Sequence, residues 1–236
     1  MVGVSPKDFW DSKILQWEEN RYGAGSKQDS WLETLAKRSS GSLRFRMSLI
    51  GYLLKEHVVG KRVVELGCGS GLMAEGIIQA GAVSYLGIDI SSIAVDEAKK
   101  RIEKAGLSHK ASFKEGDISA LSHLQGDLIF SLGLFDWLNE EQLKSVFVAD
   151  PAADFLHSFA EKRNCPTQLL HRLYVHLAYG HRTGNYKPHY FRTSELVTLA
   201  ERYHQGPVYV LRHKRLSFGA IITSLPLLDR ISQFPY

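Results

Sequence analysis

Apolar residues follow two different periods along this chain, and the change comes near residue 60. Before it, "KDFWDSKILQWEENRY", "DSWLETLAK" and "LRFRMSLIGYLLKEHV" repeat apolar residues every three to four positions, which predicts helices. Ser5 and Pro6 suit the N-cap and the first turn, so we expect the first helix to begin there and to end at Gly23. Residues 1–59 are therefore predicted to be helical.

Beyond residue 60, short apolar runs alternate with helical patterns. The runs predict strands at 62–66, 84–89, 111–115, 126–133 and 154–160, with helices at 71–80 and 92–105 and over "NEEQLKSVFV" and "SELVTLAERY". Two last strands, over "VYVLRHKRL" and "GAIITSLPL", are separated by too few residues for a crossover helix, which predicts an antiparallel pair. The fold class is α/β, with a doubly wound, mostly parallel sheet of seven strands and an antiparallel closing strand.

Composition and charge narrow the class of protein. Two cysteines, no basic-then-apolar leader and no apolar run approaching 18 residues favour a cytoplasmic protein without a membrane span. The net charge is +4, but residues 161–236 carry 11 Lys and Arg against 4 Asp and Glu. A basic cleft there would attract an anionic small molecule, a phospholipid headgroup or a nucleic acid, and charge does not choose among them.

The stretch "VVELGCGSG" contains the strongest chemical signal. Gly67, Gly69 and Gly71 stand between a strand and a helix, where backbone without Cβ atoms approaches a ligand closely and unpaired N–H groups face it. A dinucleotide fingerprint requires a glycine where Leu72 stands, which disfavours NAD. Glu65, two residues before the loop, suits a ligand with an ammonium group better than a pyrophosphate. Asp89, ending the next strand, is placed to accept hydrogen bonds from ribose hydroxyls, or else caps the following helix.

These motifs resemble the class I S-adenosylmethionine-dependent methyltransferases over most of residues 60–160. "VVELGCGSG" resembles the glycine motif of that family, "YLGIDIS" its ribose motif, "FKEGDIS" its adenine motif and "DLIFSLGLFDWL" its fourth strand. The resemblance implies a Rossmann-like domain over 60–236 with a substrate-binding insertion at about 161–193. It also implies that residues 1–59 form an N-terminal helical lid and that S-adenosyl-L-methionine is the cofactor.

The resemblance also implies a set of cofactor-binding residues. They are Glu65, Gly67, Cys68, Gly69, Gly71, Asp89, Ile90, Asp117, Ile118, Leu132, Trp17, Tyr22 and Arg46. Within this set, Glu65 is expected near the amino group, Asp89 at the ribose, Ile90, Asp117 and Ile118 at the adenine, and Arg46 at the carboxylate. Core packing explains Ile90 and Ile118 equally well. Packing also explains Trp17 and Tyr22, the proposed lid aromatics, at least as well as cofactor contact does.

After the fourth strand, many small-molecule members of the family carry a Glu-His pair, where this chain has Asp136 and Trp137. A histidine base is therefore absent there, and Asp136 either serves as the base or caps a helix. No Asn-Pro-Pro-Tyr or Asp-Pro-Pro-Tyr follows, so the signature of amino-group methylation on adenine or glutamine is missing.

The segment "HRLYVHLAYGHRTGNYKPHYF", residues 171–191, holds four histidines and four tyrosines. His171, His176 and His181 recur every five residues, a rotation of about 500° on a helix, whereas a zinc pair needs a spacing of three or four. We predict no metal site. The segment is interpreted as a wall for an aromatic or anionic acceptor, with His176 or His181 as a candidate base or as a structural residue.

The function expected from these observations is S-adenosylmethionine-dependent methylation of a small-molecule acceptor, with oxygen favoured over nitrogen. Two alternatives remain. The basic C-terminal third allows a nucleic-acid methyltransferase, although a nucleic-acid partner is the less favoured reading. The absence of a definite base allows a non-catalytic cofactor-binding partner subunit. The sequence leaves the oligomeric state open.

Overall fold

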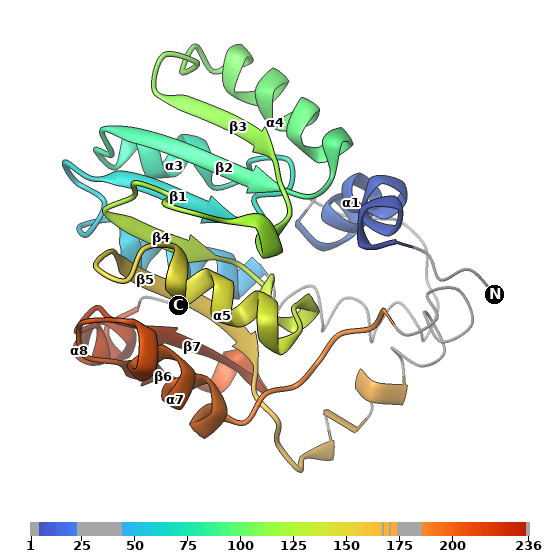
Figure 1. The fold of residues 1–236 in the computed structure, drawn as a ribbon, viewed down its shortest axis with the longest axis vertical. Helices are drawn as coiled ribbons and strands as arrows, with labels where there is room; N and C mark the ends of the chain where they lie inside the picture. Colours follow the sequence, from blue (N-terminus) through green and yellow to red (C-terminus); the bar gives the residue numbers. More distant parts are fainter. Residues whose placement is uncertain (1–4, 23–43, 167, 170, 174–185, 235–236) are drawn as a thin grey trace.

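The centre of the molecule is a seven-stranded sheet, seen in a computed structural model that describes residues 5–22, 44–166, 168–169, 171–173 and 186–234 (Figure 1). The strand order is β3-β2-β1-β4-β5-β7-β6. The strands are β1 (Arg62–Leu66), β2 (Ser84–Asp89), β3 (Ala111–Glu115), β4 (Leu128–Ser131), β5 (Asp154–Ala160), β6 (Tyr209–Leu211) and β7 (Gly219–Thr223). All five strands predicted by the buried apolar runs are present, which confirms the doubly wound sheet.

The direction of the last strands follows from their short connection. The first five strands pair in parallel, whereas β7 is antiparallel to both β5 and β6. Between β6 and β7 the chain forms one 3-10 turn, η3 (Lys214–Leu216), which is too short for a crossover. The predicted antiparallel closing strand is thus confirmed.

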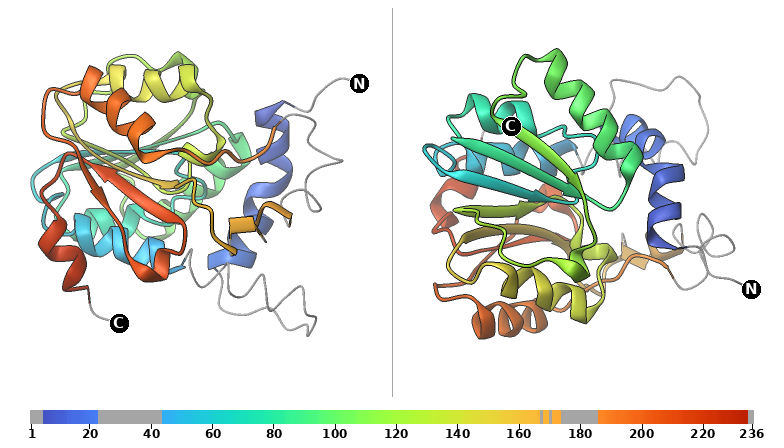
Figure 2. Two further views of the ribbon diagram at one scale, coloured as in Figure 1. Left: turned by 90° about the horizontal axis from the view of Figure 1, so that it is seen from below. Right: turned by 45° about the horizontal axis from the view of Figure 1, so that its top comes forward.

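Helices cover both faces of the sheet (Figure 2). One face carries residues 44–54, which are helical, together with α3 (Ala74–Gln79), α4 (Ser92–Lys104) and α8 (Leu228–Ser232). The other carries α5 (Glu140–Ala149) and α7 (Thr193–Tyr203). Two 3-10 turns, η1 (Ile118–Ala120) and η2 (Phe135–Trp137), follow β3 and β4. Their residues Ile118 and Phe135 are buried on the α5 side.

The two described parts of the N-terminal region have different positions. Residues 44–54 belong to the main core, where Leu49, Ile50, Leu53 and Leu54 are fully buried. Helix α1 (Pro6–Tyr22) instead lies beside the carboxyl ends of the central strands and contacts α4 (Figure 1). The predicted "DSWLETLAK" helix lies outside the described residues. The division at residue 59 remains a prediction.

The N-terminus of α1 forms as the sequence indicates. Ser5 Oγ accepts a hydrogen bond from Asp8 N–H and donates one to the Asp8 carboxylate, which satisfies an otherwise unpaired donor of the first turn. Within the described residues, each helix is too short or too polar to cross a bilayer. With this cap, α1 lies at the edge of the sheet where doubly wound folds bind their ligands.

Candidate functional site

The glycine loop after β1 has the backbone shape that its glycines predict. Gly67, Gly69 and Gly71 have φ of 69°, 52° and 72°, which is the left-handed region that other residues rarely adopt. A Cβ at Gly67 would lie 3.1 Å from Leu134, and one at Gly71 would lie 3.0 Å from Phe113. The loop is therefore packed tightly on both sides, and glycine is required by conformation and by space.

The N–H groups of the loop all have acceptors within the protein, which corrects the expectation that they are unpaired. Those of Gly67 and Cys68 donate to the Ile88 carbonyl, and that of Gly71 donates to the Cys68 carbonyl. Gly69 N–H donates to Asp89 Oδ2 over 2.8 Å, and Ser70 N–H donates to Glu18 Oε1 over 3.0 Å. Two carboxylates thus hold the centre of the loop.

Asp89 joins the loop to the end of β2. Its second oxygen accepts from Ser91 N–H over 2.9 Å, while Ser91 itself caps α4 by accepting from Ala94 N–H. Asp89 is therefore not the helix cap that the sequence left as an alternative. Burial raises the pKa of its carboxyl, and the three backbone N–H groups that donate to it oppose that shift. A carboxylate has about four acceptor sites, so Asp89 can still accept a further hydrogen bond, as from a hydroxyl group of a ligand.

Glu65 lies beneath the loop and is almost completely buried. Burial raises its pKa to about 8, although the hydroxyl of Tyr85 donates a hydrogen bond to it and lowers the pKa in part. Negative charge on Glu18 and Asp89 also raises it. The Glu65 carboxyl is consequently neutral near pH 7 until a positive charge is brought beside it.

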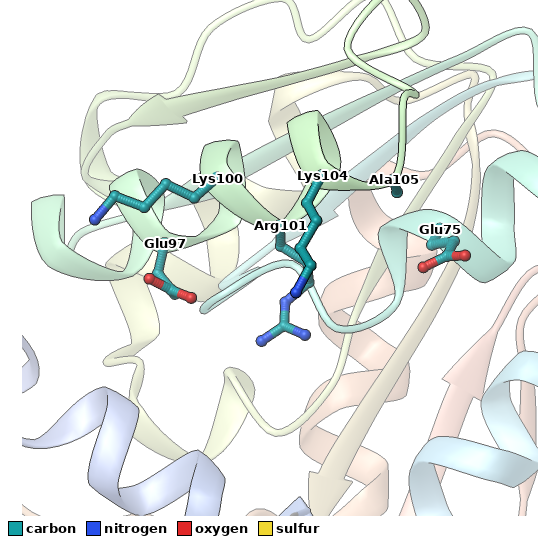
Figure 3. Close-up of a pocket in the computed structure, with 6 residues that line it drawn as sticks. All are labelled: Glu75, Glu97, Lys100, Arg101, Lys104 and Ala105. Carbon is teal, nitrogen blue, oxygen red and sulfur yellow. The ribbon is translucent and has the colours of Figure 1, made fainter.

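Glu18 of α1 is a site residue that the sequence did not indicate. The side chain is 9% exposed, and its Oε1 would lie 2.0 Å from a Cβ at Gly69. Arg101 of α4 contacts the same loop, because its Nε donates to the Ser70 carbonyl over 3.0 Å. Figure 3 shows Arg101 and Lys104 extending from α4 into a groove whose other side carries Glu75 of α3. That groove lies between α3 and α4, so it is distinct from the ligand side of the loop.

The remaining predicted cofactor contacts divide into core and surface positions. Ile118 is buried in the core, Ile90 and Leu132 are half-buried, and Cys68 is buried where a Cβ at Gly87 would lie 2.8 Å from its Sγ. Asp117 is exposed, and its Oδ1 accepts from Ser119 N–H as the cap of η1. Ile118 and Cys68 are therefore accounted for by packing alone.

A second polar group lies at the end of β4, where η2 places Asp136. Its Oδ1 accepts from Ala160 N–H over 2.6 Å, and its Oδ2 lies 3.9 Å from Arg46 Nη1. Burial raises the pKa of Asp136 to about 6, against the opposing effect of the Arg46 charge and the Ala160 hydrogen bond. Asp136 is not a helix cap, since Asn139 caps α5 with a capping box. Among the described residues no hydrogen bond is donated to Oδ2, and a carboxylate with a pKa near 6 can accept a proton at neutral pH.

Arg46 extends from the helix of residues 44–54 toward the ends of β4 and β7. It is 6% exposed, and its buried Nε finds no hydrogen-bond acceptor in the described part of the chain. A Cβ at Gly219 would lie 2.9 Å from its Nη2, and one at Gly133 would lie 3.8 Å from its Nη1. A buried N–H without an acceptor is costly, so Nε of Arg46 favours an anionic group of a ligand beside it.

Two other polar groups near β4 have structural partners. His157 of β5 is buried with its Nδ1 3.0 Å from Ser131 Oγ, and its ring stacks on those of Phe135 and Phe155. Burial lowers its pKa to about 3, which keeps the ring neutral. Among the described residues, no group of three His, Cys, Asp or Glu side chains is suitable for a metal ion.

Aromatic side chains from three segments meet above the site. Trp10 Nε1 donates to Tyr186 Oη over 2.8 Å, and both rings pack against Phe9 and against Trp137 of η2. Trp17 lies edge-on to Trp10 at 6.0 Å. Burial raises the pKa of Tyr186 to about 12, and the charges of Asp89 and Asp117 add to the shift, so Tyr186 lies near the predicted ribose and adenine residues. We call Phe9, Trp10, Trp137 and Tyr186 the aromatic lid.

Part of the insertion is not described, and several predicted residues fall there. His176 and His181 lie outside the described residues, as does the side chain of Tyr22. Residues 166, 168–169 and 171–173 of the insertion are helical. His171 Nδ1 lies 2.7 Å from the hydroxyl of Tyr190, so this histidine has a partner within the insertion.

The glycine loop and its acids fit the cofactor that the sequence implied. S-adenosylmethionine offers two ribose hydroxyls as donors, an ammonium, a sulfonium and one carboxylate. Asp89 would supply an acceptor for a hydroxyl, Glu18 and Asp89 would supply negative charge for the cationic groups, and Arg46 would supply a guanidinium for a carboxylate.

Comparisons with known proteins agree with this assignment. The sequence profile of the family described as "Methyltransferase domain" matches residues 63–149, from β1 to the end of α5. Among solved structures, magnesium protoporphyrin IX methyltransferase from Synechocystis PCC 6803, determined with bound SAH, is similar with a TM-score of 0.67 and 18% identity. The similarity covers 92% of this chain and 96% of that one, which shows a common fold.

Curated relatives match over shorter stretches. Ribosomal protein L11 methyltransferase from Photobacterium profundum is 36% identical over 55 residues, which is 23% of this chain and 19% of that protein. Ubiquinone biosynthesis O-methyltransferase from Azoarcus sp. is 35% identical over 66 residues, or 28% of each chain. The matched stretches thus span between a fifth and a third of these relatives, and the acceptors named for the two differ in kind.

Proposed function

We propose that this chain, whose residues 63–149 match the methyltransferase domain family, is a class I S-adenosylmethionine-dependent methyltransferase that methylates an oxygen atom of a small molecule. S-adenosylmethionine supplies a methyl group already activated on a sulfonium, so the protein's task is to hold the reactants in line and to exclude water. The observation that carries the proposal is Asp136, a largely buried carboxyl, 16% exposed, with a pKa of about 6 beside Arg46 at the end of β4.

The proposed cofactor site combines the loop, the acids and the lid. The proposed contacts come from the loop, the strand ends and the N-terminal region. They are Glu65, Gly67, Cys68, Gly69, Gly71, Asp89, Ile90, Asp117, Ile118, Leu132, Trp17, Tyr22 and Arg46. Asp89 accepts from a ribose hydroxyl, and Arg46 pairs with the cofactor carboxylate through Nε, which has no hydrogen-bond partner among the described residues. Glu18 and Tyr186 are added to this set, since Glu18 accepts from Ser70 N–H of the loop and the charge of Asp89 acts on both side chains.

Asp136 is the proposed general base. An alcohol or phenol oxygen is a poor nucleophile until its proton is removed, and Asp136 Oδ2 is available because Ala160 N–H occupies Oδ1. With a pKa of about 6 the carboxylate is mostly ionised at pH 7, and burial favours the neutral acid once it has taken the proton. Arg46, 3.9 Å away, keeps the pKa from rising further.

A small acceptor is favoured over nucleic acid by the pairing of the basic residues. Arg163 and Arg212 both bind the carboxylate of Glu161, at 2.6 Å each, and Arg230 pairs with Glu56. Cations held in ion pairs neutralise few phosphates. The aromatic lid next to Asp136 and Arg46 suits an aromatic or anionic molecule instead.

The test is transfer of a labelled methyl group from S-adenosylmethionine into a size-fractionated extract, with wild type and Asp136→Asn compared. We expect label in base-labile or ether-type small-molecule products with wild type and at least a hundredfold less with the variant. Label in RNA or protein fractions would support the alternative acceptors. A chain that binds the cofactor and labels nothing in any fraction would favour the non-catalytic subunit.

A further inference from the structure

We propose that Glu18 of α1 is a specificity residue, which makes the site prefer cationic S-adenosylmethionine over its product S-adenosylhomocysteine, whose sulfur is neutral. The inference rests on the proposed function, because it concerns the same ligand site. It assigns to the lid helix a role that goes beyond covering the site. A lid that holds the reactant more tightly than the product would favour product release after transfer.

The contact between Glu18 and the loop is direct. Ser70 N–H donates to Glu18 Oε1 over 3.0 Å, and the side chain is 9% exposed. Because Oε1 would lie only 2.0 Å from a Cβ at Gly69, any other residue at that position would displace the carboxylate. The glycine therefore allows an acid from a helix 52 residues away to lie against the loop backbone.

Glu18 adds charge to a site that is already acidic. Asp89 holds the N–H of Gly69, next to Ser70, and Glu65 lies beneath. Burial raises the pKa of Glu18 and the charge of Asp89 adds to it, while the hydrogen bonds of Ser70 and the charge of Arg101 oppose the shift. Glu18 in turn raises the pKa of Glu65. The three carboxyl groups thus affect one another, and together they leave negative charge only partly compensated.

A cationic ligand relieves this repulsion, and a neutral one does not. Both forms of the cofactor carry an ammonium and a carboxylate, so their difference is one methyl group and one positive charge. Each acid near the ligand contributes to that difference through its own charge, because Coulomb attraction in a buried site is weakly screened. Removing the charge of Glu18 should therefore weaken binding of the cationic form selectively.

Other contacts hold α1 in place, which allows the charge to be tested separately from the lid. Asp11 accepts from Ser91 Oγ over 2.7 Å, and Lys7 pairs with Glu115 at 2.8 Å. In Glu18→Gln the amide oxygen still accepts from Ser70 N–H, so the shape of the contact is kept. Trp10→Phe removes the hydrogen bond to Tyr186 and so loosens the lid without a change of charge. Glu19→Gln removes the same charge from an exposed position on the same helix.

The experiment is calorimetric titration of wild type and these three variants with S-adenosylmethionine and with S-adenosylhomocysteine at pH 7. For Glu18→Gln we expect the Kd of S-adenosylmethionine to rise roughly tenfold and that of S-adenosylhomocysteine to change less than twofold. For Trp10→Phe we expect both Kd values to rise by the same factor, and for Glu19→Gln neither to change. Thermal unfolding of each variant checks that the fold is intact.

Two outcomes would overturn the inference. Equal weakening of both ligands by Glu18→Gln would make Glu18 part of the lid attachment only, and tighter binding of both would make its carboxylate a competitor for the loop. Either result leaves the proposed function standing, since wild type still binds. A wild type that binds neither ligand would instead contradict the proposed function itself.

Discussion

Trp10 and Tyr186 are 176 residues apart in the sequence, yet the indole Nε1 donates a hydrogen bond of 2.8 Å to the tyrosine hydroxyl. This contact joins α1 to the predicted insertion, so one aromatic lid is assembled from segments that lie far apart in the sequence. Burial raises the pKa of Tyr186 to about 12, which keeps its hydroxyl protonated at any physiological pH.

Loss of this contact should loosen the lid over the cofactor. Tyr186→Phe keeps the ring but removes the acceptor, at a cost of about 1 kcal/mol, so we expect the Kd of S-adenosylmethionine to rise about fivefold. The double variant with Trp10→Phe should show no further loss, which a double-mutant cycle by calorimetry measures. Tyr52→Phe, whose ring packs on Phe234 and Arg230, is the control and should bind as wild type does. Additive losses would show that the two residues act separately.

The burial of Glu65 makes the stability of the ligand-free protein depend on pH. Its folded-state pKa of about 8 lies above the ordinary value of 4.5, so its contribution to stability is complete below pH 4.5 and is lost as pH rises through 8. Glu65→Gln keeps an acceptor for the Tyr85 hydroxyl and cannot ionise. Relative to this variant, the free energy of unfolding of wild type should fall by at most about 1.4 kcal/mol for each pH unit between pH 5 and 8.

Urea unfolding at several pH values measures this difference. The exposed Glu75→Gln provides the control, and its stability should run parallel to that of wild type. A constant difference between Glu65→Gln and wild type from pH 5 to 8 would show that Glu65 is already ionised in the folded protein.

Asp136 should set the acid limb of the pH–rate profile. Its pKa of about 6 means that the base is protonated and inactive below that pH, so the rate with an oxygen acceptor should rise through pH 6 and then level. Asp136→Asn keeps an acceptor for Ala160 N–H and should lower kcat by a factor of about 10² to 10⁴, with loss of that limb. A variant that keeps its rate would restrict Asp136 to positioning Ala160 and Arg46.

Gly219 leaves space for Arg46, and a methyl group at residue 219 should displace the Arg46 guanidinium, which is a proposed contact of the cofactor. The added Cβ would lie 2.9 Å from Arg46 Nη2 and 3.0 Å from the Leu216 carbonyl, so we expect Gly219→Ala to lose about 1 to 3 kcal/mol of stability and to bind S-adenosylmethionine more weakly. The control is Gly76→Ala in α3, where no atom lies within 4 Å of the new Cβ. It should gain about 0.5 to 1 kcal/mol by helix propensity. Unchanged binding by Gly219→Ala would place Arg46 outside the cofactor site.

The sequence predicted most of the sheet because its signals are local. Buried apolar runs of four to seven residues, separated by helical periods, determine β1 to β5, and the short connection after β6 determines the direction of β7. The glycine loop could be located for the same reason, since Gly67, Gly69 and Gly71 need φ values that other residues resist.

The acids and aromatics contributed by distant segments could not be predicted in this way. Glu18 stands in a helix whose apolar stripe gave no reason to bury an acid, and only its contact with Ser70 reveals the role. Tyr186 was assigned to a wall for the acceptor, whereas the structure also brings it near Asp89. The loop N–H groups were expected to be unpaired, but Asp89 and Glu18 occupy two of them. Such pairings depend on tertiary contacts, which no spacing along the chain encodes.

The central claim is that Asp89 and the glycine loop bind S-adenosylmethionine. Calorimetric titration of wild type, Asp89→Asn and Asp96→Asn tests it most directly. Asp96 is exposed on α4, so the Asp96→Asn substitution is a control that removes an equal charge outside the loop. We predict a Kd on the order of micromolar for wild type and Asp96→Asn, and binding at least about tenfold weaker for Asp89→Asn. The absence of binding by wild type, or equal binding by wild type and Asp89→Asn, would contradict the account.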